Sequence, residues 1–385
     1  MQKKKISILI ISLYSGGAER VVSILLNYFK DKFDIHLVLL QPIIEYEIPV
    51  GQQITILDKR PPGSPLQNIL RIPLLAFRYH RFLKKNNINT SLSFLNRPNF
   101  IAGFLKILGW KGKVILSERT LTSEYYTVKT VGDRIGRFLV KNLYSKANLI
   151  VCNSKNIEAD LRNTFNVQTN FRIIYNPIAL DKIEVNTKHI APLVNNNPFT
   201  FITIGRLSSI KNHLMLIKAI AILKDTNCRV QIIGKGELKE YLEKYIASIG
   251  MQERIALIDH TTNPFNYLTM ADCFVLTSNF EGFPNVVLEA LACNLPVIST
   301  DCKGGIRELL TPSISLDTPT TTGIMYGEYG LLVPVGNEQI LAQAMTKIYS
   351  DSALRQIYRL KNYNRAKNFD VSTIMKSFDE ILNQD

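Results

Sequence analysis

The 385-residue sequence lacks the marks of a secreted, membrane-spanning or zinc-binding protein. Its five cysteines lie at wide, irregular spacings without a C-x-x-C pair, which argues against both a disulfide framework and a zinc site. No apolar run approaches the roughly 18 residues that a spanning helix needs. No small-residue cleavage site follows the basic start of the chain. We therefore expect a cytoplasmic protein with reduced, mostly buried thiols.

Motifs that define several other enzyme classes are also missing. The sequence contains no G-x-x-x-x-G-K-[ST] and no H-E-x-x-H, and Gly234-Lys235-Gly236 continues to Lys239 where a dinucleotide fold needs a third glycine. These absences argue against P-loop, metal-hydrolase and oxidoreductase chemistry. The chain has no D-x-D pair either, so we predict no metal site and a reaction that proceeds without a metal ion.

Acidic residues are scarce in the first half of the chain. Residues 1–185 contain 27 Lys and Arg against 13 Asp and Glu, and residues 186–385 contain 19 of each, so the first half carries the whole net charge of +14. This asymmetry predicts an anionic partner, either nucleic acid or an anionic membrane surface. No RNP-type aromatic motif, helix-turn-helix signature or Arg-rich tail is present. We therefore rank a nucleic-acid-binding module last and expect no nucleic-acid partner.

One basic segment, residues 71–85, is predicted to be a helix after Pro73. Arg78, Arg81 and Lys85 share one face of it, and Leu74, Phe77 and Leu83 supply apolar area. This pattern suits a membrane surface or a lipid-linked diphosphate. The plainer alternative is a helix that packs on a sheet with a solvated basic side.

Short β-branched runs alternate with helical patterns along the chain, which is typical of βαβ units. Expected strands are residues 6–12, 35–40, 54–57, 88–94, 113–116, 149–152, 171–174, 200–204, 229–233, 255–257, 273–277, 296–300 and 330–333. The fold class is therefore α/β, with two Rossmann-like doubly wound domains facing a central cleft. We place the first domain at 1–180, a linker at 181–198 and the second domain at 199–364. A terminal helix at about 365–385 can pack back on the first domain.

The densest chemical signal is the segment from Glu281 to Ala290, which follows a predicted strand. Pro284 suits the first turn of a helix. We therefore expect a loop and helix N-terminus whose free amides are open to a phosphate, formed by Gly282, Phe283, Pro284, Asn285 and Val286. Glu281 and Glu289 flank it, and a carboxylate can accept two hydroxyls of a vicinal diol. The pair predicts a nucleotide that carries a sugar. The alternative is two solvated glutamates favoured by the helix dipole.

In each domain, the loop after the first strand is a further candidate for ligand binding. Gly205-Arg206-Leu207 and Lys211-Asn212 place a guanidinium and an ammonium where they could neutralise a diphosphate. Gly16 and Gly17 allow close backbone approach to a ligand. The alternatives are a solvated basic loop and a tight turn without a ligand.

Together these motifs resemble the retaining family-4 glycosyltransferases of the GT-B fold. Gly16-Gly17-Ala18-Glu19 is similar to the N-terminal glycine loop of that family, Arg206 with Lys211 to its basic pair, and Glu281 to Glu289 to its E-x7-E element. The resemblance implies that Arg206 and Lys211 bind the donor diphosphate, Glu289 the ribose and Glu281 the donor sugar. It makes Glu281, Arg206 and Lys211 the expected catalytic residues.

Two other segments enter through the same resemblance. Where many members have an acceptor-side histidine, this chain has Ser117-Glu118-Arg119-Thr120, so Glu118 and Arg119 are expected on the acceptor side. The segment from Asp301 to Glu308 is similar to a Cys-Pro-x-Gly-Pro-Arg-Glu stretch in members that build bacterial surface glycans, with Lys303 and Ile306 in place of the two prolines.

The resemblance implies a retaining, metal-independent enzyme of bacterial surface polysaccharide biosynthesis. It would move a hexose or N-acetylhexosamine from a nucleotide diphosphate sugar, most commonly a UDP-sugar, to a glycan or polyprenyl-diphosphate-linked saccharide, with no cofactor. We expect a cytoplasmic enzyme whose basic first domain attaches peripherally to the inner face of the membrane. The alternative is a catalytically inactive protein that binds sugar nucleotides or acts as a scaffold.

Overall fold

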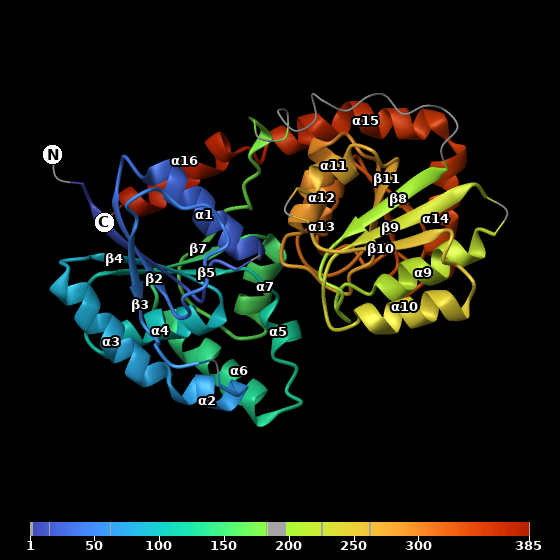
Figure 1. Cartoon of the computed structure of the whole chain (residues 1–385). Helices are drawn as coiled ribbons and strands as arrows, with labels where there is room; N and C mark the ends of the chain where they lie inside the picture. Colours follow the sequence, from blue (N-terminus) through green and yellow to red (C-terminus); the bar gives the residue numbers. More distant parts are fainter. Residues whose placement is uncertain are drawn as a thin grey trace. The chain divides into compact units, whose positions relative to one another are not determined.

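The computed structural model describes residues 3–14, 16–61, 63–181, 183, 198–224, 226–261 and 263–384 (Figure 1). The chain divides into two compact units, Met1–Pro177 with Val371–Asp385, and Ile178–Asp370. Each unit is described by itself. The linker predicted at 181–198 lies almost wholly outside the described residues.

The first unit is built on a parallel sheet with the strand order β3-β2-β1-β4-β5-β6-β7. Its strands are β1 (Lys5–Ile10), β2 (Asp34–Leu39), β3 (Gln53–Ile56), β4 (Thr90–Phe94), β5 (Lys113–Glu118), β6 (Leu149–Cys152) and β7 (Phe171–Ile173). In the central strand, Ile8 lies opposite Leu37 on one side and Leu92 on the other. The order reverses between β1 and β4, so loops that leave neighbouring strands at this point meet at the carboxyl edge of the sheet.

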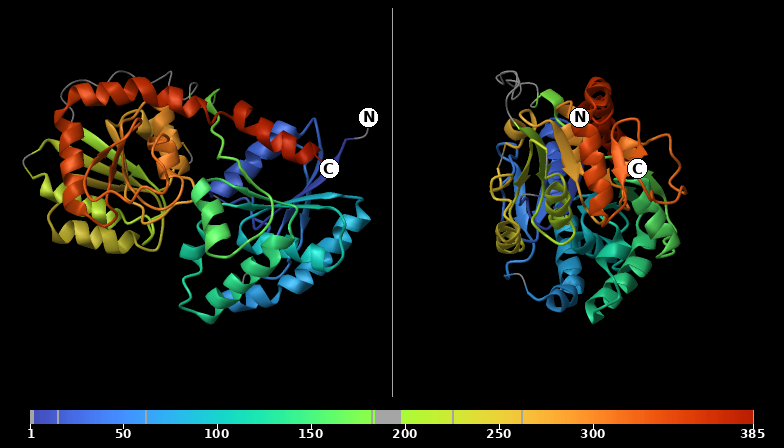
Figure 2. Two further views of the ribbon diagram at one scale, coloured as in Figure 1. Left: turned by 180° about the vertical axis from the view of Figure 1, so that it is seen from behind. Right: turned by 90° about the vertical axis from the view of Figure 1, so that its right-hand side faces the viewer.

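Helices cover both faces of this sheet (Figures 1 and 2). One layer contains α1 (Gly17–Phe29) and α16 (Val371–Asn383), whose buried residues share a core with β1, β2 and β4. The other contains α3 (Ile72–Lys85), α4 (Asn96–Ile107) and α6 (Val131–Leu143). The short elements are α2 (Pro65–Leu70), α5 (Thr122–Tyr125), the 3-10 turn Tyr144–Lys146 and α7 (Lys155–Asn163). In α16 the buried Ile374, Phe378 and Ile381 recur at helical spacing, which turns one face of that helix toward the sheet.

Helix α3 confirms the plainer interpretation of residues 71–85, a helix packed on the sheet, and the membrane surface stays a prediction. The helix buries Ile72, Leu75, Ala76, Tyr79 and Leu83, so it packs on the unit as an ordinary amphipathic helix. Leu83 is fully buried, and its assignment to an exposed apolar area was wrong. Leu74 and Phe77 are exposed beside the exposed Arg78, Arg81 and Lys85.

The second unit has the strand order β10-β9-β8-β11-β12-β14-β13. Its strands are β8 (Phe199–Ile204), β9 (Cys228–Ile233), β10 (Ile255–Ile258), β11 (Cys273–Leu276), β12 (Val297–Thr300), β13 (Met325–Tyr326) and β14 (Leu331–Val333). All neighbours pair in parallel except β13, which runs antiparallel to β14. Strand β13 was not predicted because its two residues are too short to show any alternation. The α/β fold class with two doubly wound parallel sheets is confirmed.

Helices α9 (His213–Ile222), α10 (Lys239–Ser248) and α14 (Glu338–Ser350) cover one face of the second sheet, where their apolar residues form a single core with the strands. The other face carries α11 (Phe265–Leu268), α12 (Asn285–Ala292) and α13 (Ile306–Leu310). Helix α15 (Ser352–Lys367) packs against α12. Across the described residues, the helices are all too short or too polar to span a bilayer.

Candidate active site

An ion pair joins two loops at the carboxyl edge of the second sheet. Lys211 Nζ lies 2.5 Å from Glu281 Oε1, and the Ser278 hydroxyl donates to the same oxygen over 2.6 Å. Lys211 follows β8 and Glu281 follows β11, and these two strands are neighbours. The structure thus brings together two of the predicted site residues. Ser278 carried no sequence signal of its own.

The loop that contains Glu281 leads directly into α12. Pro284 occupies the N-cap position and the helix begins at Asn285, so the prediction that the proline lies in the first helical turn was one residue off. Within the described part of the chain, α12 has no side-chain cap. Its N-terminus therefore presents the positive end of the helix dipole at this edge. Glu289, one turn further on, is only 4% exposed.

The basic loop after β8 rests on two glycines. A Cβ atom on Gly234 would lie 1.9 Å from the Gly205 carbonyl oxygen, and one on Gly236 would lie 2.3 Å from the Leu207 carbonyl oxygen. Leu207 also donates its amide to the Lys235 carbonyl over 3.0 Å. The lack of side chains at Gly234 and Gly236 thus allows this segment to pack directly against the loop that carries the exposed Arg206.

His213, at the start of α9, lies buried behind this loop. Burial and the nearby Lys211 charge lower the pKa of His213 to about 4, so the imidazole is neutral at pH 7. The histidine therefore adds no charge of its own to the Lys211–Glu281 pair.

In the first unit, Gly16 and Gly17 lie at the start of α1, at the end of the segment that connects β1 to this helix. Gly16 is the N-cap of α1, and Tyr46 donates its hydroxyl to the Gly16 carbonyl over 3.1 Å. A Cβ atom on Gly16 would meet Glu19 Oε2 at 2.1 Å. The absence of a side chain at Gly16 therefore makes room for the Glu19 carboxylate at this helix start.

Glu118 ends β5 and is fully buried. Its carboxylate accepts hydrogen bonds from the Tyr144 hydroxyl at 2.7 Å and from the Arg119 amide at 2.9 Å. With the Asn96 amide turned so that its nitrogen faces Glu118, that nitrogen lies 2.8 and 3.0 Å from the two carboxylate oxygens. Burial raises the pKa of Glu118 to about 7. Glu118 thus sits at the centre of an internal polar network, with its side chain away from solvent.

Arg119 is also buried. Its Nε donates to the Ser117 hydroxyl over 2.8 Å and its Nη1 to the Asn176 side chain over 2.7 Å, while the guanidinium lies over the rings of Phe94 and Phe378. Burial lowers the pKa of Arg119 to about 10. The side chain connects the end of β5 to α16 and to Asn176.

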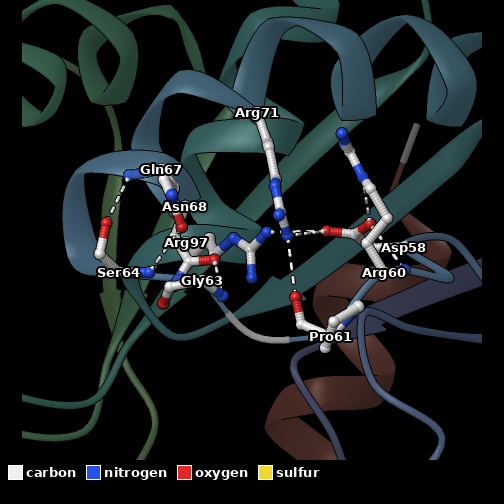
Figure 3. Close-up of polar contacts among 9 residues, drawn as sticks. All are labelled: Asp58, Arg60, Pro61, Gly63, Ser64, Gln67, Asn68, Arg71 and Arg97. Carbon is white, nitrogen blue, oxygen red and sulfur yellow. Dashed lines mark hydrogen bonds and ion pairs between the residues drawn. The ribbon is translucent and has the colours of Figure 1, made fainter.

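A second charged cluster, which sequence inspection missed, surrounds Asp58 after β3 (Figure 3). Arg97 Nη2 donates to Asp58 Oδ2 over 3.1 Å, Arg60 Nε approaches Oδ1 at 3.4 Å, and Arg71 Nη1 lies 3.7 Å from Oδ2. Although burial opposes ionisation, the hydrogen bonds from Arg60 and Arg97 lower the pKa of Asp58. These four residues together carry two more positive than negative charges. We call them the Asp58 cluster.

Comparison with solved structures identifies the fold. The chain superposes on HepE from Anabaena, solved in complex with UDP, with a TM-score of 0.76 and 17% identity over 98% of this chain and 99% of that one. For sucrose-phosphate synthase from Thermosynechococcus elongatus the TM-score is 0.82, again at 17% identity, over 98% of both chains. The fold is that of the GT-B glycosyltransferases.

Sequence comparison identifies the family. The model "Glycosyltransferase Family 4" matches residues 15–182, and "Glycosyl transferases group 1" matches residues 185–367. A relative from Campylobacter jejuni, N-acetylgalactosamine-N,N'-diacetylbacillosaminyl-diphospho-undecaprenol 4-alpha-N-acetylgalactosaminyltransferase, is 37% identical over 95% of this chain and 96% of its own length. The chain belongs to the family-4 glycosyltransferases, as its motifs predicted.

The buried Glu118 makes stability depend on pH. Its pKa in the folded chain, about 7, lies above the ordinary value of 4.5, so the folded state holds the proton more tightly than the unfolded state does. The contribution of Glu118 to stability is then largest below pH 4.5 and is lost as pH rises through 7. From pH 5 to pH 8 the wild type should lose up to about 3 kcal/mol of unfolding free energy relative to Glu118→Gln.

Urea unfolding of both proteins at pH 5, 6, 7 and 8 measures this difference, with the exposed Glu253→Gln as the matched control. A difference between wild type and Glu118→Gln that stays constant over this range would contradict the assignment.

Proposed function

We propose that the protein transfers a hexose or N-acetylhexosamine, with retention at the anomeric carbon, from a nucleotide diphosphate sugar to a saccharide carried on a polyprenyl diphosphate. The observation that carries the proposal is the juxtaposition of Lys211, Glu281 and the N-terminus of α12 at one sheet edge. The acceptor in the name of the Campylobacter jejuni relative is a saccharide on diphospho-undecaprenol, and this supports the acceptor class. Assembly of a bacterial surface glycan is the process in which we place this step.

The donor diphosphate is assigned to Arg206, Lys211 and the amides at the start of α12. A diphosphate needs charge-assisted donors, and a guanidinium, an ammonium and a helix N-terminus are the groups that supply them. Glu289 is assigned to the ribose hydroxyls and Glu281 to the sugar hydroxyls. The UDP complex of HepE supports a uridine nucleotide as the donor.

Retention follows, in this proposal, from a reaction on one face of the sugar. The bond between the anomeric carbon and the diphosphate oxygen breaks, and the acceptor oxygen bonds to the same face while its proton passes to the departing diphosphate. Arg206, Lys211 and the α12 amides stabilise the charge that develops on the leaving group, and Glu281 orients the sugar. Because these groups can do this alone, we propose that no metal ion takes part.

Removal of either basic residue should weaken nucleotide binding. Arg206→Ala and Lys211→Ala are each expected to cost about 2 kcal/mol of UDP binding free energy, which is typical of a charge-assisted hydrogen bond. Calorimetry with UDP measures the effect, and Lys244→Ala on the exposed side of α10 is the control. Unchanged affinity in both site variants would reject the diphosphate assignment.

Loss of transfer in excess chelator, restored by magnesium, would reject metal independence.

Glu281→Gln tests the mechanism. The amide keeps the shape of the side chain but loses the charge that orients the sugar, so kcat should fall about 100-fold without any weakening of UDP binding. Slow hydrolysis of a panel of UDP-sugars measures kcat before the acceptor is known, and NMR of the product gives its anomeric configuration. An inverted product, or a glycosyl adduct trapped on Glu281 and found by mass spectrometry, is incompatible with this mechanism.

The acceptor diphosphate is assigned to the first unit. Residues 59–117 contain eleven Lys and Arg and no Asp or Glu, and Arg97 and Asp58 follow β4 and β3 at the carboxyl edge of the sheet. The excess positive charge of the Asp58 cluster, drawn in Figure 3, suits a dianionic group. The predicted acceptor-side residues Glu118 and Arg119 support this edge from inside, since both are buried.

Attachment to an anionic membrane is assigned to the exposed face of α2 and α3. Leu66, Leu70, Leu74 and Phe77 are exposed there, followed by the exposed Arg78, Arg81, Lys84 and Lys85. Helix α6, which packs against α2, adds the exposed Val131, Arg134, Phe138 and Lys141. Apolar side chains bordered by cations are what an interfacial surface requires.

Vesicle flotation tests this surface. The wild type should float with vesicles of phosphatidylethanolamine and phosphatidylglycerol at low salt and with pure phosphatidylcholine vesicles far less. Leu70→Asp with Phe77→Asp, at positions 70% and 48% exposed, should reduce recovery about 10-fold. Leu360→Asp in the second unit, at a position 68% exposed, is the control and should float as the wild type does. Equal recovery of all three proteins would reject this face as the membrane-binding surface, and the basic charge of the first unit would then serve another anionic partner.

A further inference from the structure

Beside the Glu281 loop lies a second loop segment, residues 300–307, which comprises the last residue of β12, the connecting residues 301–305 and the first two residues of α13. Glu281 donates its amide to the Lys303 carbonyl over 3.0 Å, and Gly305 donates its amide to the Gly282 carbonyl over 2.9 Å. The Thr300 hydroxyl donates to the Ser278 carbonyl over 2.6 Å. The backbone on both sides of Glu281 is thus hydrogen-bonded to the second loop.

Gly304 brings the two loops into direct contact. A Cβ atom on Gly304 would lie 1.8 Å from the Glu281 carbonyl oxygen, and the residue adopts a φ of +121°, a conformation that favours glycine. Any shift of the 303–305 segment therefore moves the peptide that carries Glu281.

A buried ion pair closes this second loop at its two ends. Arg307 Nε and Nη2 donate to Asp301 Oδ1 and Oδ2 over 2.7 and 2.6 Å, and both side chains are less than a tenth exposed. The remaining bonds bind the neighbouring loop: Arg307 Nη1 donates to the Thr318 carbonyl over 2.7 Å, and the Thr321 amide donates to Asp301 Oδ2 over 2.8 Å. The pair therefore holds three chain segments in one arrangement.

We infer that Asp301 and Arg307 form a positioning pair for Glu281, acting through residues 303–305. A buried ion pair adds little net stability, because the loss of hydration offsets most of the attraction. What a bidentate pair does supply is a fixed geometry, since its two parallel hydrogen bonds set both distance and orientation. Here that geometry determines where the Glu281 carboxylate lies relative to Lys211 and Ser278. The inference rests on the role proposed for Glu281.

Arg307→Lys keeps the charge but loses the second hydrogen bond. We expect kcat for donor hydrolysis to fall at least about 20-fold, with the KM for the UDP-sugar changed less than about 3-fold, because Arg206, Lys211 and Glu289 are outside the 301–307 loop. Arg254→Lys is the matched control. Its guanidinium also bonds backbone carbonyls in the same unit, at Cys228 and Leu223, and its replacement should leave kcat unchanged.

The decisive measurement is a double-mutant cycle with Glu281→Gln. If Arg307 acts through Glu281, Arg307→Lys should change kcat less than about 2-fold once Glu281→Gln is present. Should Arg307→Lys fail to fold, as judged by thermal unfolding, Asp301→Asn, which changes the same pair from its other side, replaces it in the same cycle.

Full additivity in the cycle, or an unchanged kcat in the single variant, would overturn the positioning role alone. Normal turnover in Glu281→Gln would overturn the proposed role of Glu281 and the positioning pair with it.

Discussion

The contact between Lys211 and Glu281 depends on the order of the strands in the second sheet. Because β8 and β11 are parallel neighbours, the loops that leave them end at the same edge, although the two residues are 70 positions apart. In the first unit β3 and β4 are separated by β2 and β1, but they run parallel and end at the same edge, where Asp58 and Arg97 meet through the length of the arginine side chain. In a parallel sheet the carboxyl edge is where side chains from distant segments are collected. The helices on each face serve to hold these strands in register.

Much of the fold was predictable because its signals are local. Buried β-branched runs repeat at the spacing of βαβ units, and Gly282 and Pro284 mark the turn into α12. The loops to which we assign donor binding could be found for the same reason, since each lies directly after a predicted strand. The two-residue β13 could not be predicted, because it is a strand only through its antiparallel pairing with β14. Its own sequence shows no strand pattern.

The unpredicted parts of the site depend on tertiary contacts. Asp58 and Arg97 are separated by 39 residues, and neither belongs to a motif. The burial of Glu118 follows from its contacts with Tyr144 and Asn96, which come from two other elements. Leu95 has a φ of +73°, which could not be predicted from the sequence because leucine rarely adopts a positive φ. This strained turn before α4 places Asn96 toward Glu118 and Arg97 toward Asp58, and so joins the internal network to the Asp58 cluster.

The two charged clusters balance their charges in different ways. At the Asp58 cluster the guanidiniums of Arg60, Arg71 and Arg97 share one carboxylate, so positive charge is in excess before any ligand arrives. At the other site Lys211 is matched one to one by Glu281. In the proposed function, an anion that takes up the Lys211 ammonium competes with Glu281 for it, and the carboxylate, which keeps the Ser278 hydrogen bond, can then accept hydroxyl groups of the sugar. Binding of the diphosphate and orientation of the sugar would then be coupled through a single ion pair, because the same event that engages Lys211 releases Glu281.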